Sequence, residues 1–125
     1  MRFTKDSTKT VEDTDTSTLM PIVITGINGA VKQDTALTRV TCYEETNIIV
    51  TGTLTIPDER FSLPVKREDG RIYLFLAEVI SGAFTVVLNF PVSGTFTYSN
   101  AEANKNFPEP IFSVETLTFD VLRKV

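Results

Sequence analysis

Ile48-Ile49-Val50-Thr51-Gly52-Thr53-Leu54-Thr55-Ile56 is the stretch of sequence that decides the fold. Its threonines alternate with Val50, Gly52, Leu54 and Ile56. Successive side chains of a β-strand point to opposite faces, so this alternation predicts a strand with one face in a core and a threonine stripe facing water. Threonine is frequent throughout, with 19 copies, and its branched side chain favours strands.

The same period of two continues from Leu19 onward. Further strands are predicted over residues 21–25, 37–42, 60–65, 72–79, 84–90, 92–98 and 111–125. Turn signals such as Asn28-Gly29, Asp69-Gly70 and Ser81-Gly82 separate several of them. Many short strands at regular spacing predict an all-β fold, an immunoglobulin-like antiparallel β-sandwich over residues 19–125, with a jelly roll or small barrel as the alternative.

Three segments of this domain need a separate interpretation. Ile72 to Val79 is apolar on both faces, which is typical of a central strand or of a strand with one face on a partner. The last predicted strand changes phase, and we expect a β-bulge near Glu115-Thr116 to reconcile its two halves. Ala101 to Lys105 is too short and polar to form a helix unaided.

Composition limits the class of protein. A chain of 125 residues that is 42% hydrophobic is expected to form one domain with its own core. Cys42 is the single cysteine, so a disulfide framework is excluded, and intracellular synthesis is favoured. No long apolar run or signal peptide is found, so we expect no membrane contact, and the net charge of −4 argues against nucleic acid as a partner.

The residues offer little for catalysis. Histidine, the usual proton carrier near neutral pH, is absent. The acidic pairs Glu44-Glu45, Asp58-Glu59 and Glu68-Asp69 lie beside turns and are expected to be solvated charges there. Cys42 has no base to activate it and is expected to be a buried, inert thiol. Residues 13–17 carry oxygen-bearing side chains like those of the first half of a calcium-binding loop, but the central glycine of such a loop is missing. We therefore expect no bound metal. With no catalytic motif present, we also expect neither an enzyme nor a cofactor.

Two segments are candidates for binding a partner. Residues 1–18 are polar and threonine-rich, with Phe3 and Val11 as apolar anchors and Leu19 just after them. Such an extended N-terminal arm is either a frayed terminus or a strand added to the sheet edge of a neighbouring subunit. In the loop of residues 99–110, Phe107 is followed by a proline. This loop is interpreted either as a stiff apolar tip that inserts into a groove of a partner or as an ordinary surface connection.

A sugar site is a second hypothesis. Tyr43, Tyr73 and Tyr98 would line it together with Phe107, because aromatic rings stack on carbohydrate faces. The simpler interpretation is that the tyrosines pack within the sheet.

The stretch from Phe61 to Tyr98 also carries a resemblance. Phe61-Ser62-Leu63-Pro64-Val65, Asp69-Gly70-Arg71, Ala77-Glu78-Val79, Gly82-Ala83-Phe84, Leu88-Asn89-Phe90 and Ser93-Gly94-Thr95-Phe96 resemble the immunoglobulin-like sandwiches of tailed-bacteriophage structural proteins. The resemblance implies a virion component without catalytic residues, made in the host cytoplasm and present in many copies or as a homo-oligomer. Its expected role is capsid decoration on the major capsid protein; a tail or neck accessory and a carbohydrate- or receptor-binding module are the alternatives.

Overall fold

The computed structural model describes residues 19–124, and almost all of the regular structure in this part of the chain is β. The predictions for Phe3, Val11 and the arm of residues 1–18 concern residues outside this range. The elements are β2 (Met20–Asn28), β3 (Lys32–Gln33), β4 (Arg39–Tyr43), β5 (Asn47–Thr53), β6 (Glu59–Arg67), β7 (Ile72–Ile80), β8 (Ala83–Asn89), β9 (Gly94–Tyr98), α1 (Asn100–Ala103), β10 (Phe112–Val114) and β11 (Leu117–Leu122).

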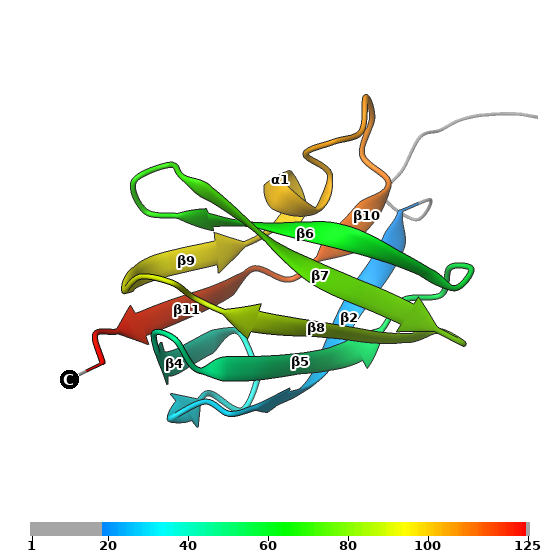
Figure 1. Ribbon diagram of the computed structural model, residues 1–125. Coiled ribbons are helices and arrows are strands. Elements are labelled where there is room, and N and C mark those ends of the chain that lie inside the picture. The colour runs from blue at the N-terminus through cyan, green and yellow to red at the C-terminus, as the bar shows by residue number, and fades with distance from the viewer. Residues whose placement is uncertain (1–18, 125) are drawn as a thin grey trace, which may run out of the picture.

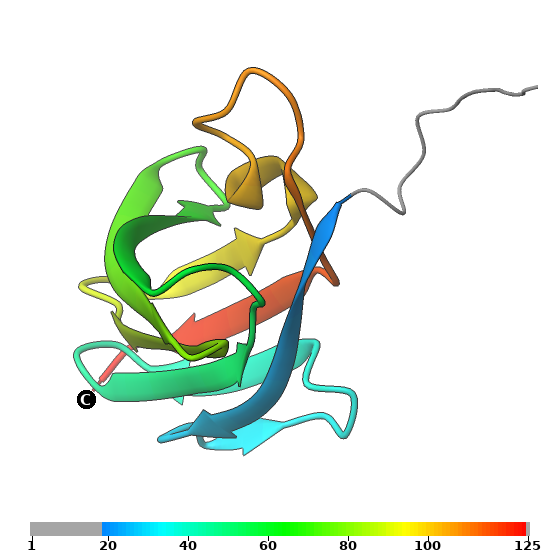
Figure 2. The ribbon, with the colours of Figure 1, turned by 90° about the vertical axis from the view of Figure 1, so that its right-hand side faces the viewer.

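Within residues 19–124 the strands form one ten-stranded sheet, in the order β10-β2-β5-β8-β7-β6-β9-β11-β4-β3. The sheet curls into a half-barrel, as Figures 1 and 2 show, and its concave side encloses the core. The prediction of an all-β fold is therefore confirmed.

The arrangement as an immunoglobulin-like sandwich of antiparallel sheets is not confirmed. The described strands make one sheet rather than two, and the sheet is mixed, because β10 pairs parallel with β2 and β11 pairs parallel with β4. Both parallel pairs come from the last segment of the chain. That segment breaks at Glu115 and Thr116, so β10 lies at one edge of the sheet while β11 lies between β9 and β4.

This break corrects the prediction of a bulge. The phase change falls at Glu115-Thr116, as the sequence indicated, but it separates two strands with different partners. A register shift of the bulge type occurs instead in β2, between Ile24 and Gly26 opposite β5.

The core confirms most of the predicted inward positions. Ile48, Val50 and Leu54 are buried while Thr53 and Thr55 are exposed, although β5 ends at Thr53 rather than Ile56. Four phenylalanines are among the largest fully buried side chains, namely Phe84, Phe90, Phe96 and Phe119. The hairpin turns at Gly70 and Gly82 have positive φ angles of 93° and 79°, which glycine adopts without strain.

The single turn of helix α1 is held by its neighbours. Ser99 donates from its backbone N and its Oγ to Oε1 of Glu102, at 2.8 and 2.6 Å, which is a capping arrangement. The side chain of Asn100 accepts a bond from the backbone N of Val114 in β10. Side-chain bonds to a strand therefore stabilise a helix that is too short to form alone.

Candidate interaction surface

The convex side of the sheet carries an exposed aliphatic patch. It consists of Leu74 and Leu76 on β7, Val87 on β8 and Ile49 on β5, which are 62%, 61%, 45% and 39% exposed. Ile49 pairs directly with Val87, and Val87 and Leu76 line one shallow hollow of about 250 Å³. We call these four residues the outer patch. The three strands lie side by side in Figure 1.

The patch follows from the strand pattern. Along β7, Tyr73, Phe75, Ala77 and Val79 point toward the core, so the leucines between them must point to solvent. Of the two interpretations of Ile72 to Val79, the central strand is confirmed by its position, because β7 lies between β8 and β6. A partner on its exposed face stays a prediction. An exposed leucine alone is ordinary, whereas adjoining aliphatic side chains on three strands are typical of a contact surface.

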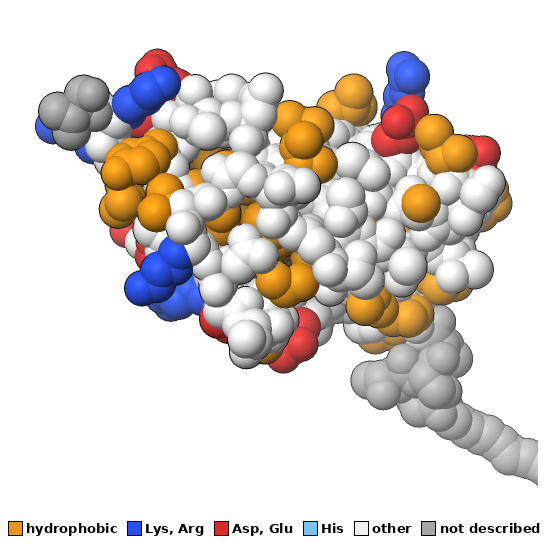
Figure 3. Space-filling model, turned by 90° about the horizontal axis from the view of Figure 1, so that it is seen from below, with side chains coloured by type: hydrophobic (Ala, Val, Ile, Leu, Met, Phe, Trp, Pro, Cys, Tyr) orange, Lys and Arg blue, Asp and Glu red, His pale blue; other side chains and the backbone are white. Residues whose placement is uncertain are grey.

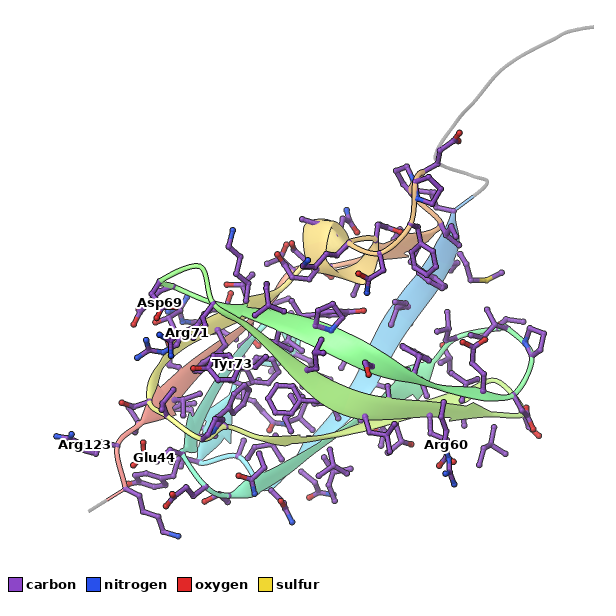
Figure 4. The ribbon with its side chains drawn as sticks, turned by 45° about the horizontal axis from the view of Figure 1, so that its top comes forward. Glu44, Arg60, Asp69, Arg71, Tyr73 and Arg123 are labelled. Atoms are coloured by element: carbon purple, nitrogen blue, oxygen red, sulfur yellow. The ribbon has the colours of Figure 1, made fainter. Side chains whose placement is uncertain are left out.

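The charges beside the outer patch are paired. Arg60 Nε lies 3.0 Å from Glu78 Oε2, and both residues line the same hollow as Leu76 and Val87. Figure 4 shows Arg60 far from the end of the molecule where Asp69, Arg71 and Arg123 gather. Figure 3 shows the underside of the molecule, where few charged side chains lie over the middle. Covering the outer patch would therefore bury few unpaired charges.

A second feature is a cleft of about 220 Å³ at one end of the half-barrel. Over the stretch that contains Pro64, β6 pairs with β7 alone, since β9 meets it only at Lys66 and Arg67. Helix α1 and the loop that follows lie across the gap. The walls are mainly apolar: Ile22, Leu54, Ile56, Phe61, Pro64, Ala103, Phe107 and Phe112.

Two buried polar side chains, Tyr98 and Glu102, also line the cleft, with 4% and 7% of their surfaces exposed. Burial, and then the nearby carboxylate of Glu102, raise the pKa of the Tyr98 hydroxyl, so it stays protonated as a donor. Within the described part of the chain, the carboxylate of Glu102 accepts its two hydrogen bonds from Ser99, both at Oε1.

The structure describes two of the four residues that are predicted to bind a partner. Phe3 and Val11 lie outside the described residues, as stated above. Leu19 is half-buried and directly precedes β2. Phe107 is exposed but does not project as a bare tip, because its ring packs edge-on to Phe112 at 5.8 Å and lines the cleft. Since Met20 pairs with Phe112, the structure brings Leu19 and Phe107 to the same end of the molecule.

The tyrosine platform proposed for sugar binding does not form. Tyr98 is buried, and Tyr73 packs edge-on to the buried ring of Phe96 at 5.4 Å. Tyr43 is exposed at the end of β4, on a different part of the sheet. The interpretation of Tyr73 and Tyr98 as packing residues is confirmed, whereas sugar binding as a function stays a prediction.

The remaining polar candidates have structural partners. Asp58 accepts a bond from the backbone N of Ser81, and Asp69 accepts one from Arg71, so both carboxylates hold turns. Burial, assisted by Asp120, raises the pKa of the Cys42 thiol to about 11, which makes it a poor nucleophile. Among residues 19–124, no group of three or more cysteines or carboxylates is placed to hold a metal ion.

Neither the outer patch nor the cleft is predicted by the sequence alone. The signal for the patch was present in the two apolar faces of Ile72 to Val79, but its partners on β5 and β8 follow only from the register. The cleft is lined by Ile22 and by residues from the stretches 54–64 and 98–112, which are distant in sequence, and nothing local in the sequence indicates it.

The structure and the comparisons give no family to which the chain could be assigned. No protein-family model, curated protein or solved structure matches it. In the described part of the chain, no helix has the length and hydropathy needed to cross a membrane.

Proposed function

We propose that this protein is a non-enzymatic structural component of a virion, a capsid decoration protein that stabilises the particle through contacts between subunits. The observation that carries the proposal is the outer patch. The partner would be the major capsid protein, as the resemblance of Phe61 to Tyr98 to phage proteins implies.

The energetics of the outer patch suit an adhesive role. Full burial of a leucine, isoleucine or valine side chain is worth about 1.5–3 kcal/mol, and the four residues of the patch are already partly buried. One copy would therefore bind weakly through this face. Many copies on a lattice stabilise the assembly by mass action and multivalency, which is how a decoration protein acts.

The rigidity of the outer patch supports the same role. Its residues lie on paired strands of a continuous sheet, so little backbone entropy is lost on binding. The ion pair of Arg60 with Glu78 beside the patch can stay at the rim and set the orientation.

The decisive experiment changes the outer patch without changing the core. In the variant Leu74→Glu/Leu76→Glu, two charges replace exposed side chains, and the fold should be retained. The matched control is Gln33→Glu/Thr35→Glu, which adds the same charge at exposed positions near the far edge of the sheet. Circular dichroism and thermal unfolding would establish that both variants are folded.

Binding is then measured by co-sedimentation with particles of the virus whose genome encodes the chain, stripped of this protein. The wild-type chain and the control should sediment with the particles, and the patch variant should not. The proposal fails if the wild-type chain does not bind, or if the patch variant binds as well as the control.

The same sedimentation separates the alternative locations in the virion. A tail or neck accessory would sediment with isolated tails or connectors and not with empty heads. A carbohydrate- or receptor-binding module would bind neither and would instead bind a glycan or the host surface, independently of Leu74 and Leu76.

A further inference from the structure

The cleft beside α1 lies next to the point where the described chain begins. Met20 pairs with Phe112, and its backbone N donates to the carbonyl of Ile111 at 2.8 Å. Phe112 and the neighbouring Ile22 both line the cleft. Residues 1–18 therefore join the domain at the side of this cleft, and the segment is the nearest sequence that can supply an occupant.

The lining of the cleft defines the chemistry that it would bind. Its volume of about 220 Å³ and its phenylalanine and aliphatic walls suit one aromatic side chain. Two acidic residues, the buried Glu102 and the exposed Glu59, are also among the residues that line the cleft. Among the described residues that line the cleft, none is basic. The complement is an aromatic residue with cations beside it.

Residues 1–18 contain one such group. Phe3 lies in the run Arg2-Phe3-Thr4-Lys5, whereas Val11 is followed by Glu12 and Asp13. Resting on the multi-copy assembly proposed above, we infer that the cleft binds residues 2–5 of a second copy of this chain, with the Phe3 ring between its apolar walls. The carboxylates of Glu59 and Glu102 would face Arg2 and Lys5.

Charge and length favour a second copy over the same chain. The acidic residues Glu12, Asp13 and Asp15 lie closest to Leu19 in sequence. A fold back into the chain's own cleft would hold them beside its carboxylates, which is repulsive. Fifteen residues lie between Phe3 and Leu19, and this stretch spans up to about 50 Å when extended. That exceeds the roughly 30 Å width of a domain of this size.

The test is a disulfide between two chains. A full-length Thr4→Cys chain is mixed with a full-length Asn106→Cys chain under mild oxidation, because Thr4 adjoins Phe3 and Asn106 lines the cleft while exposed. The matched control replaces the second chain with Val92→Cys, also exposed but near Ser93 and Arg67, at the other end of the sheet. Products are identified by mass spectrometry, and circular dichroism confirms folding.

We expect the Thr4–Asn106 product to exceed the Thr4–Val92 product by about tenfold or more, since each tenfold corresponds to 1.4 kcal/mol and burial of a phenylalanine supplies that much. Adding Phe3→Ala to the Thr4→Cys chain should remove the excess. Equal products, no product, or insensitivity to Phe3→Ala would overturn the inference. So would a dilute Thr4→Cys/Asn106→Cys chain that closes on itself more readily than it links to another chain.

This experiment uses the purified chain without particles and leaves Leu74 and Leu76 unchanged. Failure here would leave co-sedimentation through the outer patch unaffected. Failure of co-sedimentation would leave the exchange of residues 2–5 between copies intact.

Discussion

The side chain of Asn104 satisfies both backbone groups of Phe112. Its Oδ1 accepts a bond from the Phe112 backbone N at 2.8 Å, and its Nδ2 donates to the Phe112 carbonyl at 2.9 Å. The same amide accepts from Ile111 N and donates to the carbonyl of Asn100. A side chain thus takes the place of a neighbouring strand along β10, an edge that would otherwise be open to pairing with other chains.

Replacement of Asn104 should destabilise this edge. Asn104→Ala removes four hydrogen bonds and leaves backbone groups of Phe112 without a partner, so we expect a loss of about 2–3 kcal/mol in the free energy of unfolding. Asn104→Asp should be at least as harmful, because a carboxylate oxygen would face two carbonyl oxygens. Urea denaturation measures both losses, and Lys105→Ala, at the exposed next position, is the control.

Hydrogen exchange locates the effect. In Asn104→Ala the amides of Ile111 and Phe112 should exchange much faster, while those of β8 should stay protected. Uniform acceleration across the sheet would contradict a local role for Asn104.

These contacts show where the sequence stops being informative about the fold. The inward positions on β5 and β8 could be predicted, because the parity of side chains along a strand is a local property. The division of residues 112–122 between two partners could not, because it depends on pairing with β2 and β4, which lie far away in sequence. Asn104 could not be recognised either, since an asparagine near a loop is ordinary there.

The candidate surfaces, too, could be predicted only in part from the sequence. Ile72 to Val79 signalled a strand with two apolar faces, and one of them became the outer patch. Its extent required the register that places Ile49 against Val87. The tyrosines did not identify a site, because a large aromatic residue in a strand occurs in a core as well as on a binding face.

Gly52 should tolerate no side chain. A Cβ there would overlap the carbonyl oxygen of Val23 and lie 3.1 Å from the Cα of Ile24, where β2 crosses β5 beside its register shift. Backbone atoms cannot move aside as the end of a side chain can. We expect Gly52→Ala to lower the free energy of unfolding by about 2–3 kcal/mol. Thr53→Ala, at the exposed next position, should change it little in the same thermal unfolding measurement, and equal effects would contradict this account.

Cys42 should make stability fall at alkaline pH. Burial raises the pKa of its thiol from about 9 to about 11, so between these values the unfolded chain loses a proton that the folded chain keeps. Stability from the buried neutral thiol is present in full below pH 9 and decreases above it by up to about 1.4 kcal/mol per pH unit. Cys42→Ala should reduce the slope of urea stability against pH between 9 and 11. Tyrosine ionisation contributes equally to both chains, so identical slopes would refute the burial argument.

Phe90 should be the most sensitive position in the aromatic core. Its ring centre lies 4.5 Å from that of Phe96 and 5.3 Å from those of Phe75 and Phe119. Phe90, which directly follows β8, therefore packs against side chains of β7, β9 and β11. Phe90→Ala would leave a cavity where the curled sheet faces itself, at a cost of about 3–5 kcal/mol. Phe90→Leu refills most of that volume and should cost about 1 kcal/mol. Calorimetry of both variants, with the exposed Val92→Ala as control, distinguishes lost packing from a general effect of substitution. A loss for Phe90→Leu as large as that for Phe90→Ala would mean that ring geometry, and not filled volume, holds the half-barrel closed.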